Sequence, residues 1–109
     1  MSKTGKTSTY WARIYIAGDV TEAERICRTF VMCGLCVNVT PTNYLYTGGS
    51  ETGVIVELIN YPRFPSSPED IRNQAENLAS SLMFGLCQGS YTIMYPDDTE
   101  YFDRRDEFN

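Results

Sequence analysis

The chain has 109 residues, of which 42% are hydrophobic and 21% charged, so its length suits one domain and its composition excludes a largely disordered protein. A net charge of −5 disfavours binding to a phosphate backbone, and the absence of His excludes imidazole bases, Ser–His and Cys–His nucleophile pairs and His metal ligands. No apolar run is long enough to cross a bilayer, and the polar start MSKTGKTSTY lacks a signal-peptide core, so we expect a cytoplasmic protein without membrane contact.

The first half of the chain predicts a polar arm, a strand and a helix. Residues 1–9 are expected to be disordered, and the alternation of apolar and polar side chains over residues 11–16 predicts a half-buried strand. Thr21 and Glu24 have the spacing of a capping box at a helix start, and Gly34 suits the left-handed residue after the helix ends. The apolar residues on one face of this helix, expected in the core, are Ala23, Ile26, Cys27, Phe30 and Val31.

The second half repeats the scheme with a hairpin inserted. Residues 35–41 alternate again, and residues 42–61 hold two apolar segments around a Gly-rich loop, which predicts a β-hairpin. Ser67 is the predicted N-cap of a second helix and Pro68 its first residue. Residues 90–95 predict the last core strand. The predicted buried stripe of the second helix is Ile71, Ala75, Leu78, Ala79, Leu82 and Met83.

The resulting order of elements, β-α-β-β-α-β, predicts a ferredoxin-like α+β fold. In that fold a four-stranded antiparallel sheet carries both helices on one face. The predicted domain covers residues 10–96, and the acidic residues 97–109 are expected to form a solvated tail with little order.

The cysteines include a C-x-x-C pair, Cys33 and Cys36, whose role the predicted helix decides. A redox pair of this kind works with its first thiol at a helix N-terminus, whereas Cys33 lies at the C-terminal end of the predicted helix. A zinc site needs further ligands, which Cys27 on the helix stripe, the lone Cys87 and the missing His do not supply. We therefore expect buried cysteines and no metal site.

Two surfaces are candidate binding sites, and no residue is assigned a catalytic role. The Gly-rich hairpin loop can present backbone N–H groups to an anion, with its flanking tyrosines as anchors, or it is a mobile tip without function. The candidate binding residues are Tyr44, Tyr46, Gly48, Gly49, Ser50, Glu51, Thr52 and Gly53. The sheet face without helices favours oligomerisation, and its candidate interface residues are Trp11, Arg13, Tyr15 and Tyr61.

Residues 21–65 resemble the CutA family, in which a helix leads into a CVN strand, a hairpin and a strand ending near FP. CutA and the similar PII signalling proteins form trimers with ligands or effector loops at the subunit clefts, so the resemblance implies a homo-oligomer, with a trimer favoured. The chain departs from the family because no segment like HPYE follows the second helix, which argues against metal binding. The short acidic chain also resembles small accessory proteins of bacteriophages, many of which disarm a host protein or defence signal.

Three functions are therefore open. The favoured hypothesis is a non-catalytic protein that binds and inhibits a host protein, because the residues of common catalytic schemes are missing and the open sheet face is aromatic. The alternative is a PII-like oligomer that binds or sequesters a small nucleotide-like ligand at subunit clefts. An enzyme that uses carboxylates such as Glu51, Glu57 or Asp19 comes third.

Overall fold

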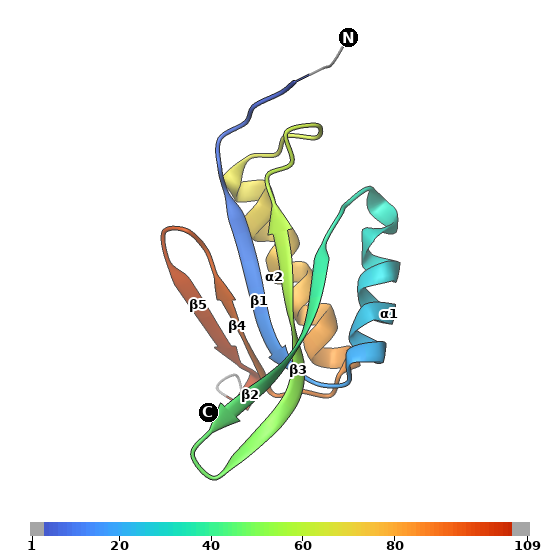
Figure 1. Ribbon diagram of the computed structural model, residues 1–109, viewed down its shortest axis with the longest axis vertical. Helices are drawn as coiled ribbons and strands as arrows, with labels where there is room; N and C mark the ends of the chain where they lie inside the picture. The colour runs from blue at the N-terminus through green and yellow to red at the C-terminus, as the bar shows by residue number, and fades with distance from the viewer. Residues whose placement is uncertain (1–3, 106–109) are drawn as a thin grey trace.

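The computed structural model describes residues 4–105, in which two α-helices pack against a five-stranded antiparallel sheet (Figure 1). The strands lie in the order β2-β3-β1-β4-β5, so β1 is central. The α+β class is confirmed, but the predicted count of four strands is wrong. The elements are β1 (Trp11–Ala17), α1 (Val20–Phe30), the 3-10 helix η1 (Val31–Cys33), β2 (Asn38–Tyr46), β3 (Gly49–Ile59), α2 (Pro68–Gly85), β4 (Ser90–Met94) and β5 (Thr99–Asp103).

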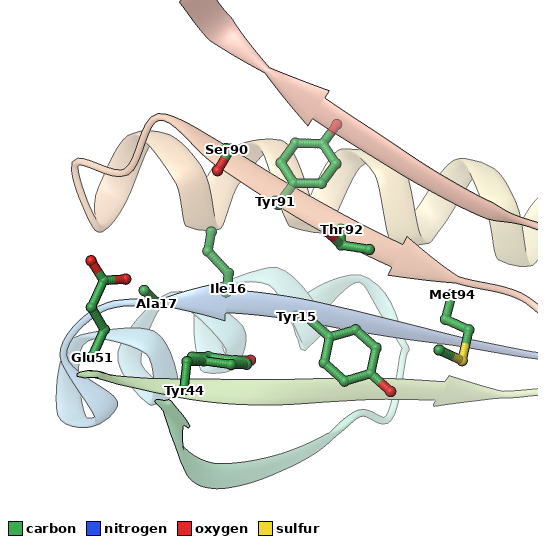
Figure 2. Close-up of a pocket in the computed structure, with 9 residues that line it drawn as sticks. All are labelled: Tyr15, Ile16, Ala17, Tyr44, Glu51, Ser90, Tyr91, Thr92 and Met94. Carbon is green, nitrogen blue, oxygen red and sulfur yellow. The ribbon is translucent and has the colours of Figure 1, made fainter. Parts of the chain in front are cut away.

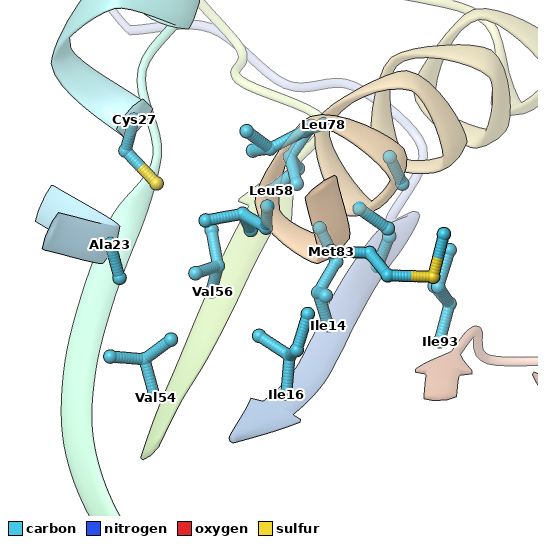
Figure 3. Packing of buried hydrophobic residues seen from close by; sticks show 14 of the residues in the cluster. Ile14, Ile16, Ala23, Cys27, Val54, Val56, Leu58, Leu78, Met83 and Ile93 are labelled. Atoms are coloured by element: carbon cyan, nitrogen blue, oxygen red, sulfur yellow. The ribbon is translucent and has the colours of Figure 1, made fainter. Parts of the chain in front are cut away.

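The hydrophobic core lies between the helices and one face of the sheet. Successive side chains of a strand point to opposite faces, so β1 buries Ala12, Ile14 and Ile16 and leaves its other residues half-buried on the opposite face. Each large aliphatic side chain buried in this way contributes about 1.5–3 kcal/mol. The side chains that meet in the core (Figure 3) include Ile14, Ile16, Ala23, Cys27, Val54, Val56, Leu58, Leu78, Met83 and Ile93.

The ends of the two helices follow the sequence with one correction. The N-cap of α1 is Asp19, whose side chain accepts a hydrogen bond from the backbone N–H of Glu22 at 2.9 Å, so the predicted cap at Thr21 is wrong. Asp is at least as good an N-cap as Thr, and the helix begins one residue before Thr21. Gly34 is left-handed after η1 (φ 104°), and Ser67 caps α2, both as predicted.

The hairpin between β2 and β3 is tighter than predicted. Thr47 and Gly48 form the turn, with Gly48 at a φ of 90°, and Tyr46 already pairs with Gly49. Residues 49–53 therefore belong to β3, and the prediction of a loop over them is wrong. A left-handed Gly48 closes the turn in two residues, which keeps the following residues in register with β2.

The fifth strand comes from the segment expected to be a tail. Residues Thr99–Asp103 pair with the whole length of β4, and the Phe102 ring stacks on Tyr91 with 5.4 Å between ring centroids. The prediction of a solvated tail over 97–109 is wrong for this stretch, while residues 106–109 lie outside the described part of the chain.

A single arginine of α2 holds the β4–β5 turn against the helix. The Arg72 guanidinium lies 2.9 Å from Asp97, 2.7 Å from Asp98 and 3.3 Å from Glu100. It also lies 3.9 Å from the ring centroid of Tyr95, a residue buried beneath the turn. Charges that a sequence reading assigns to a solvated tail are therefore paired with a cation from another element.

The arm before β1 is held at one point by Asn60. The amide of Asn60 donates to the hydroxyl of Thr7 at 3.0 Å and to the carbonyl of Ser8 at 2.8 Å. This part of the arm therefore differs from the expected disorder of residues 1–9, of which residues 1–3 lie outside the described chain.

The cysteines differ from the prediction of general burial. Cys27 is buried among the core residues, but Cys33, Cys36 and Cys87 are exposed, because Cys33 ends η1 at the surface and the other two lie in the segments that follow η1 and α2. No group of three potential metal ligands occurs among residues 4–105. Within the same residues no helix is both long and apolar enough to cross a membrane.

Replacing Arg72 by Met should lower the free energy of unfolding by about 1–3 kcal/mol, because the carboxylates of the turn lose their cation and Tyr95 its cation–π partner. Arg25→Met is the matched control, since Arg25 is exposed and its partner is Glu22 in the same helix; its loss should stay within about 0.5 kcal/mol. Urea unfolding at neutral pH measures both. Equal losses in the two variants would show that Arg72 does not hold the turn.

Candidate functional site

One face of the sheet carries no helix, and its residues come from alternate positions of adjacent strands. On β1 these positions are Trp11, Arg13 and Tyr15, and on β3 their neighbours include Ile55 and Glu57. All five side chains are large, and they lie on the face of the sheet opposite to the core residues of the same strands. This face is where side chains can meet a ligand without disturbing the core.

A cavity of about 430 Å³ lies on this open face (Figure 2). In Figure 2 the rings of Tyr15 and Tyr44 lie side by side along its floor, while Glu51 and Met94 stand at opposite ends. Ser90, Tyr91 and Thr92, three hydroxyl-bearing residues of β4, line it from the other side. The cavity is lined by Tyr15, Ile16, Ala17, Tyr44, Glu51, Ser90, Tyr91, Thr92 and Met94.

The position of Tyr44 in this cavity depends on a glycine in the neighbouring strand. The Tyr44 hydroxyl donates to the carbonyl of Val54 at 2.6 Å, and its ring lies over Gly53. A Cβ on Gly53 would stand 2.5 Å from Cε2 of Tyr44 and 2.5 Å from the carbonyl oxygen of Ile16. A tyrosine phenol is protonated at neutral pH, and burial raises the pKa of Tyr44 further, so the hydroxyl remains a hydrogen-bond donor.

Next to the cavity along β1 lies an ion pair. Nε of Arg13 is 2.7 Å from the carboxylate of Glu57, and the guanidinium lies 4.3 Å from the ring centroid of Trp11. Asn38 approaches the other Glu57 oxygen at 3.5 Å. Because Arg13 pairs across the sheet with Met94, the ion pair begins where the cavity ends.

A second cavity of about 440 Å³ lies between α1 and β2, on the helix side of the sheet. Its walls are mainly apolar, with Val31, Leu35 and Val37 among them, and Glu24 and Arg28 stand at its border. It holds no aromatic ring. The open-face cavity therefore offers the more varied chemistry for a polar, planar ligand.

The structure brings together only part of the predicted binding set. Tyr15, Tyr44 and Glu51 line the cavity, and Gly53 supports Tyr44. Tyr61 lies beyond the end of β3. The predicted residues that do not line this cavity are Tyr46, Gly48, Gly49, Ser50 and Thr52 in the hairpin and Trp11 and Arg13 on β1.

Sequence reasoning missed the contribution of β4. Ser90, Thr92 and Met94 all line the cavity, and the same strand sends Ile93 into the core. The alternation in SYTIM was a usable signal, because it places these three residues on the face opposite Ile93. The pairing of β4 with β1 then sets Thr92 beside Tyr15.

Comparisons with known proteins give two structural matches that cover most of both chains. No family model and no curated protein matches the sequence. A phage SAM lyase in the apo state has a TM-score of 0.68 at 18% identity, over 86% of this chain and 88% of that one. A phage SAM lyase in complex with S-methyl-5′-thioadenosine has a TM-score of 0.61 at 15% identity, over 94% and 95%.

These matches correct the favoured functional hypothesis. At 18% and 15% identity the likeness shows the fold, and the two matched proteins are both named as lyases, which are enzymes. The predictions of a non-catalytic binding protein and of no enzyme activity are therefore contradicted. They rested in part on the missing His, which excludes most hydrolase mechanisms but not a lyase mechanism. The resemblance to CutA and PII proteins is not tested by these matches and stays a prediction.

Replacing Gly53 by Ala should lower the free energy of unfolding by about 1–3 kcal/mol, because the new Cβ collides with Tyr44 and with the β1 backbone. Gly89→Ala is the control, since a Cβ there meets nothing within 4 Å. Adding Tyr44→Ala to Gly53→Ala should give a loss smaller than the sum of the single losses. Strict additivity in this thermal or urea unfolding cycle would mean that the Tyr44 ring does not lie over Gly53.

Proposed function

We propose that this chain is a lyase that cleaves S-adenosylmethionine (SAM) and releases S-methyl-5′-thioadenosine. The observation that carries the proposal is the likeness to two SAM lyase structures over most of both chains. The lining of the open-face cavity supports it independently, because that lining suits a cationic adenosine derivative.

The cavity offers contacts for both features of such a molecule. The rings of Tyr15 and Tyr44 provide flat surfaces on which an adenine stacks, and Ser90 and Thr92 supply hydroxyl groups to its polar edges. A sulfonium is a permanent cation, which the aromatic face of Tyr15 and the Glu57 carboxylate attract. The net charge of −5 also favours the approach of a cationic substrate.

The ion pair beside the cavity suits the amino-acid end of SAM. Tyr15 and Arg13 lie on the same face of β1, two residues apart, which is a separation of about 7 Å. A substrate that stacks on Tyr15 can therefore extend to Arg13 and Glu57. There the α-carboxylate of the substrate can pair with the Arg13 guanidinium, and its α-ammonium with the Glu57 carboxylate. Each side chain of the ion pair then binds the substrate in place of the other side chain.

The reaction breaks the bond between the sulfonium sulfur and the Cγ of the aminobutyrate group. The electron pair of that bond passes to sulfur, which becomes the neutral thioether of S-methyl-5′-thioadenosine. The remaining fragment leaves either as an alkene after loss of a Cβ proton or as a lactone after attack of its own carboxylate on Cγ. Neither route needs water or His; a carboxylate beside the aminobutyrate group, such as Glu57, can accept the proton of the first, and orientation of the substrate supplies the second.

A homo-oligomer, with a trimer favoured, is part of this proposal, together with the ferredoxin-like classification. The strand order β2-β3-β1-β4 with both helices on one side supports the classification. The open face supports the oligomer, because a second copy seated on Trp11 and Tyr15 would exclude water from the bound sulfonium. Light scattering should then give a multiple of the 12.4 kDa monomer mass, and a monomer throughout the micromolar range would reject this part.

The lyase proposal is tested by incubating the purified protein with SAM and separating the products by liquid chromatography and mass spectrometry. S-methyl-5′-thioadenosine should accumulate with enzyme concentration, and the mass of the second product distinguishes alkene from lactone. Glu57→Gln and Tyr15→Ala should each lower kcat/KM at least about tenfold, the loss of one cation contact of roughly 1.4 kcal/mol.

Glu69→Gln is the matched control, because Glu69 is exposed in the first turn of α2, away from the open face, and its activity should equal that of the unchanged protein. Product formation that never exceeds the spontaneous rate in buffer would overturn the proposal. Activity that is equal in Glu57→Gln and Glu69→Gln would keep the reaction but remove Glu57 from the site.

A further inference from the structure

The C-x-x-C pair lies in a cleft that the lyase proposal does not use. The cleft has a volume of about 300 Å³ and lies at the end of the molecule where η1 turns toward β2. Both Cys33 and Cys36 line it, both are exposed, and both are free thiols. Its opposite wall includes the exposed rings of Tyr61 and Phe64.

The backbone between the two cysteines turns back on itself. Gly34 has a φ of 104°, and the N–H groups of Gly34 and Leu35 both donate to the carbonyl of Val31, at 3.0 and 3.2 Å. The thiol of Cys33 donates to the carbonyl of Phe30 at 3.2 Å, a weak bond at the surface that a reaction can break. A Cβ at Gly34 meets nothing within 4 Å, so this turn has room to adjust.

We propose that Cys33 and Cys36 are a reversible modification site, at which a low-molecular-weight disulfide such as oxidised glutathione oxidises them to an intramolecular disulfide. One cysteine thiolate attacks a sulfur of the small disulfide and releases one thiol, which leaves a mixed disulfide on the protein. The second cysteine thiolate then attacks the protein sulfur and releases the other thiol. The protein loses two hydrogen atoms and two electrons, and the small disulfide is reduced to two thiols.

The other two cysteines provide internal comparisons for this chemistry. Cys27 is buried, which raises its pKa to about 11, so it has little thiolate and little access to a disulfide. Cys87 is exposed but lies after α2, in a different part of the fold from the cleft. Cys36 shares one cavity with Cys27 and this cleft with Cys33, but the Cys27 thiol is buried, so Cys33 is its accessible partner. An intramolecular partner outcompetes glutathione because its effective concentration is high.

The oxidation links the end of η1 to the segment that enters β2. Cys36 stands two residues before Asn38, the first residue of that strand, and it also lines the cavity between α1 and β2. The disulfide therefore fixes the connection between α1 and the edge of the sheet. It leaves the open face untouched, so this site is independent of the proposed lyase activity.

The test is equilibration of the full-length protein in a glutathione redox buffer, followed by acid quenching and intact-mass spectrometry with peptide mapping. The oxidised protein should lose two hydrogen atoms through a Cys33–Cys36 disulfide and carry one glutathione, on Cys87. Cys33→Ser should instead carry a glutathione on Cys36, while Cys87→Ser should keep the disulfide and lose the adduct. Two separate glutathione adducts on Cys33 and Cys36, or no change at either thiol while Cys87 reacts, would overturn the proposal.

Discussion

Both helices pack on the same face of the sheet, and this placement decides what the other face can do. The alternation of β1 sends Ala12, Ile14 and Ile16 into the core, so Arg13 and Tyr15 must point away from the helices. A shift of one residue in the register of this central strand would exchange the two sets and bury a charge. The hydrophobic core therefore fixes the positions of two sets of side chains: its own, and the polar and aromatic ones on the open face.

The open face becomes a site because its strands contribute unlike side chains at the same level. Tyr15 from β1, Tyr44 from β2 and Thr92 from β4 meet there, although they are far apart in the sequence. Gly53 permits this arrangement, since the Tyr44 ring occupies the space that a side chain at position 53 would need. Because Gly53 has no Cβ, the Tyr44 ring can lie flat on the sheet and form part of the cavity wall.

The sequence predicted the elements whose signals are local and missed those that depend on distant contacts. The alternation of β1, the cap at Ser67 and the left-handed Gly34 are properties of a few neighbouring residues, and each is present. The fifth strand was missed because its acidic turn is stabilised by Arg72, which lies 25 residues before Asp97. A charge in a polar segment looks solvated until its partner is known.

The candidate site was predicted in part for the same reason. Tyr44 and Glu51 stood out beside a Gly-rich segment. The alternation in β4 gives the face on which its residues lie, but the pairing of β4 with β1 was needed to place them in the same cavity. The enzyme hypothesis was ranked last on chemical grounds. Without His the chain lacks the general base that hydrolases commonly use. A sulfonium compound, however, already carries its leaving group, so its cleavage needs mainly the correct orientation of the substrate.

The most direct test of the account is a nuclear magnetic resonance titration of the protein with S-methyl-5′-thioadenosine, the compound bound to one of the similar lyases. The account predicts that the largest backbone amide shifts occur at Tyr15, Tyr44 and Glu51 and along Ser90–Met94. Shifts confined to the cavity between α1 and β2, at residues such as Val31 and Val39, would contradict it and move the binding site to the helix side of the sheet.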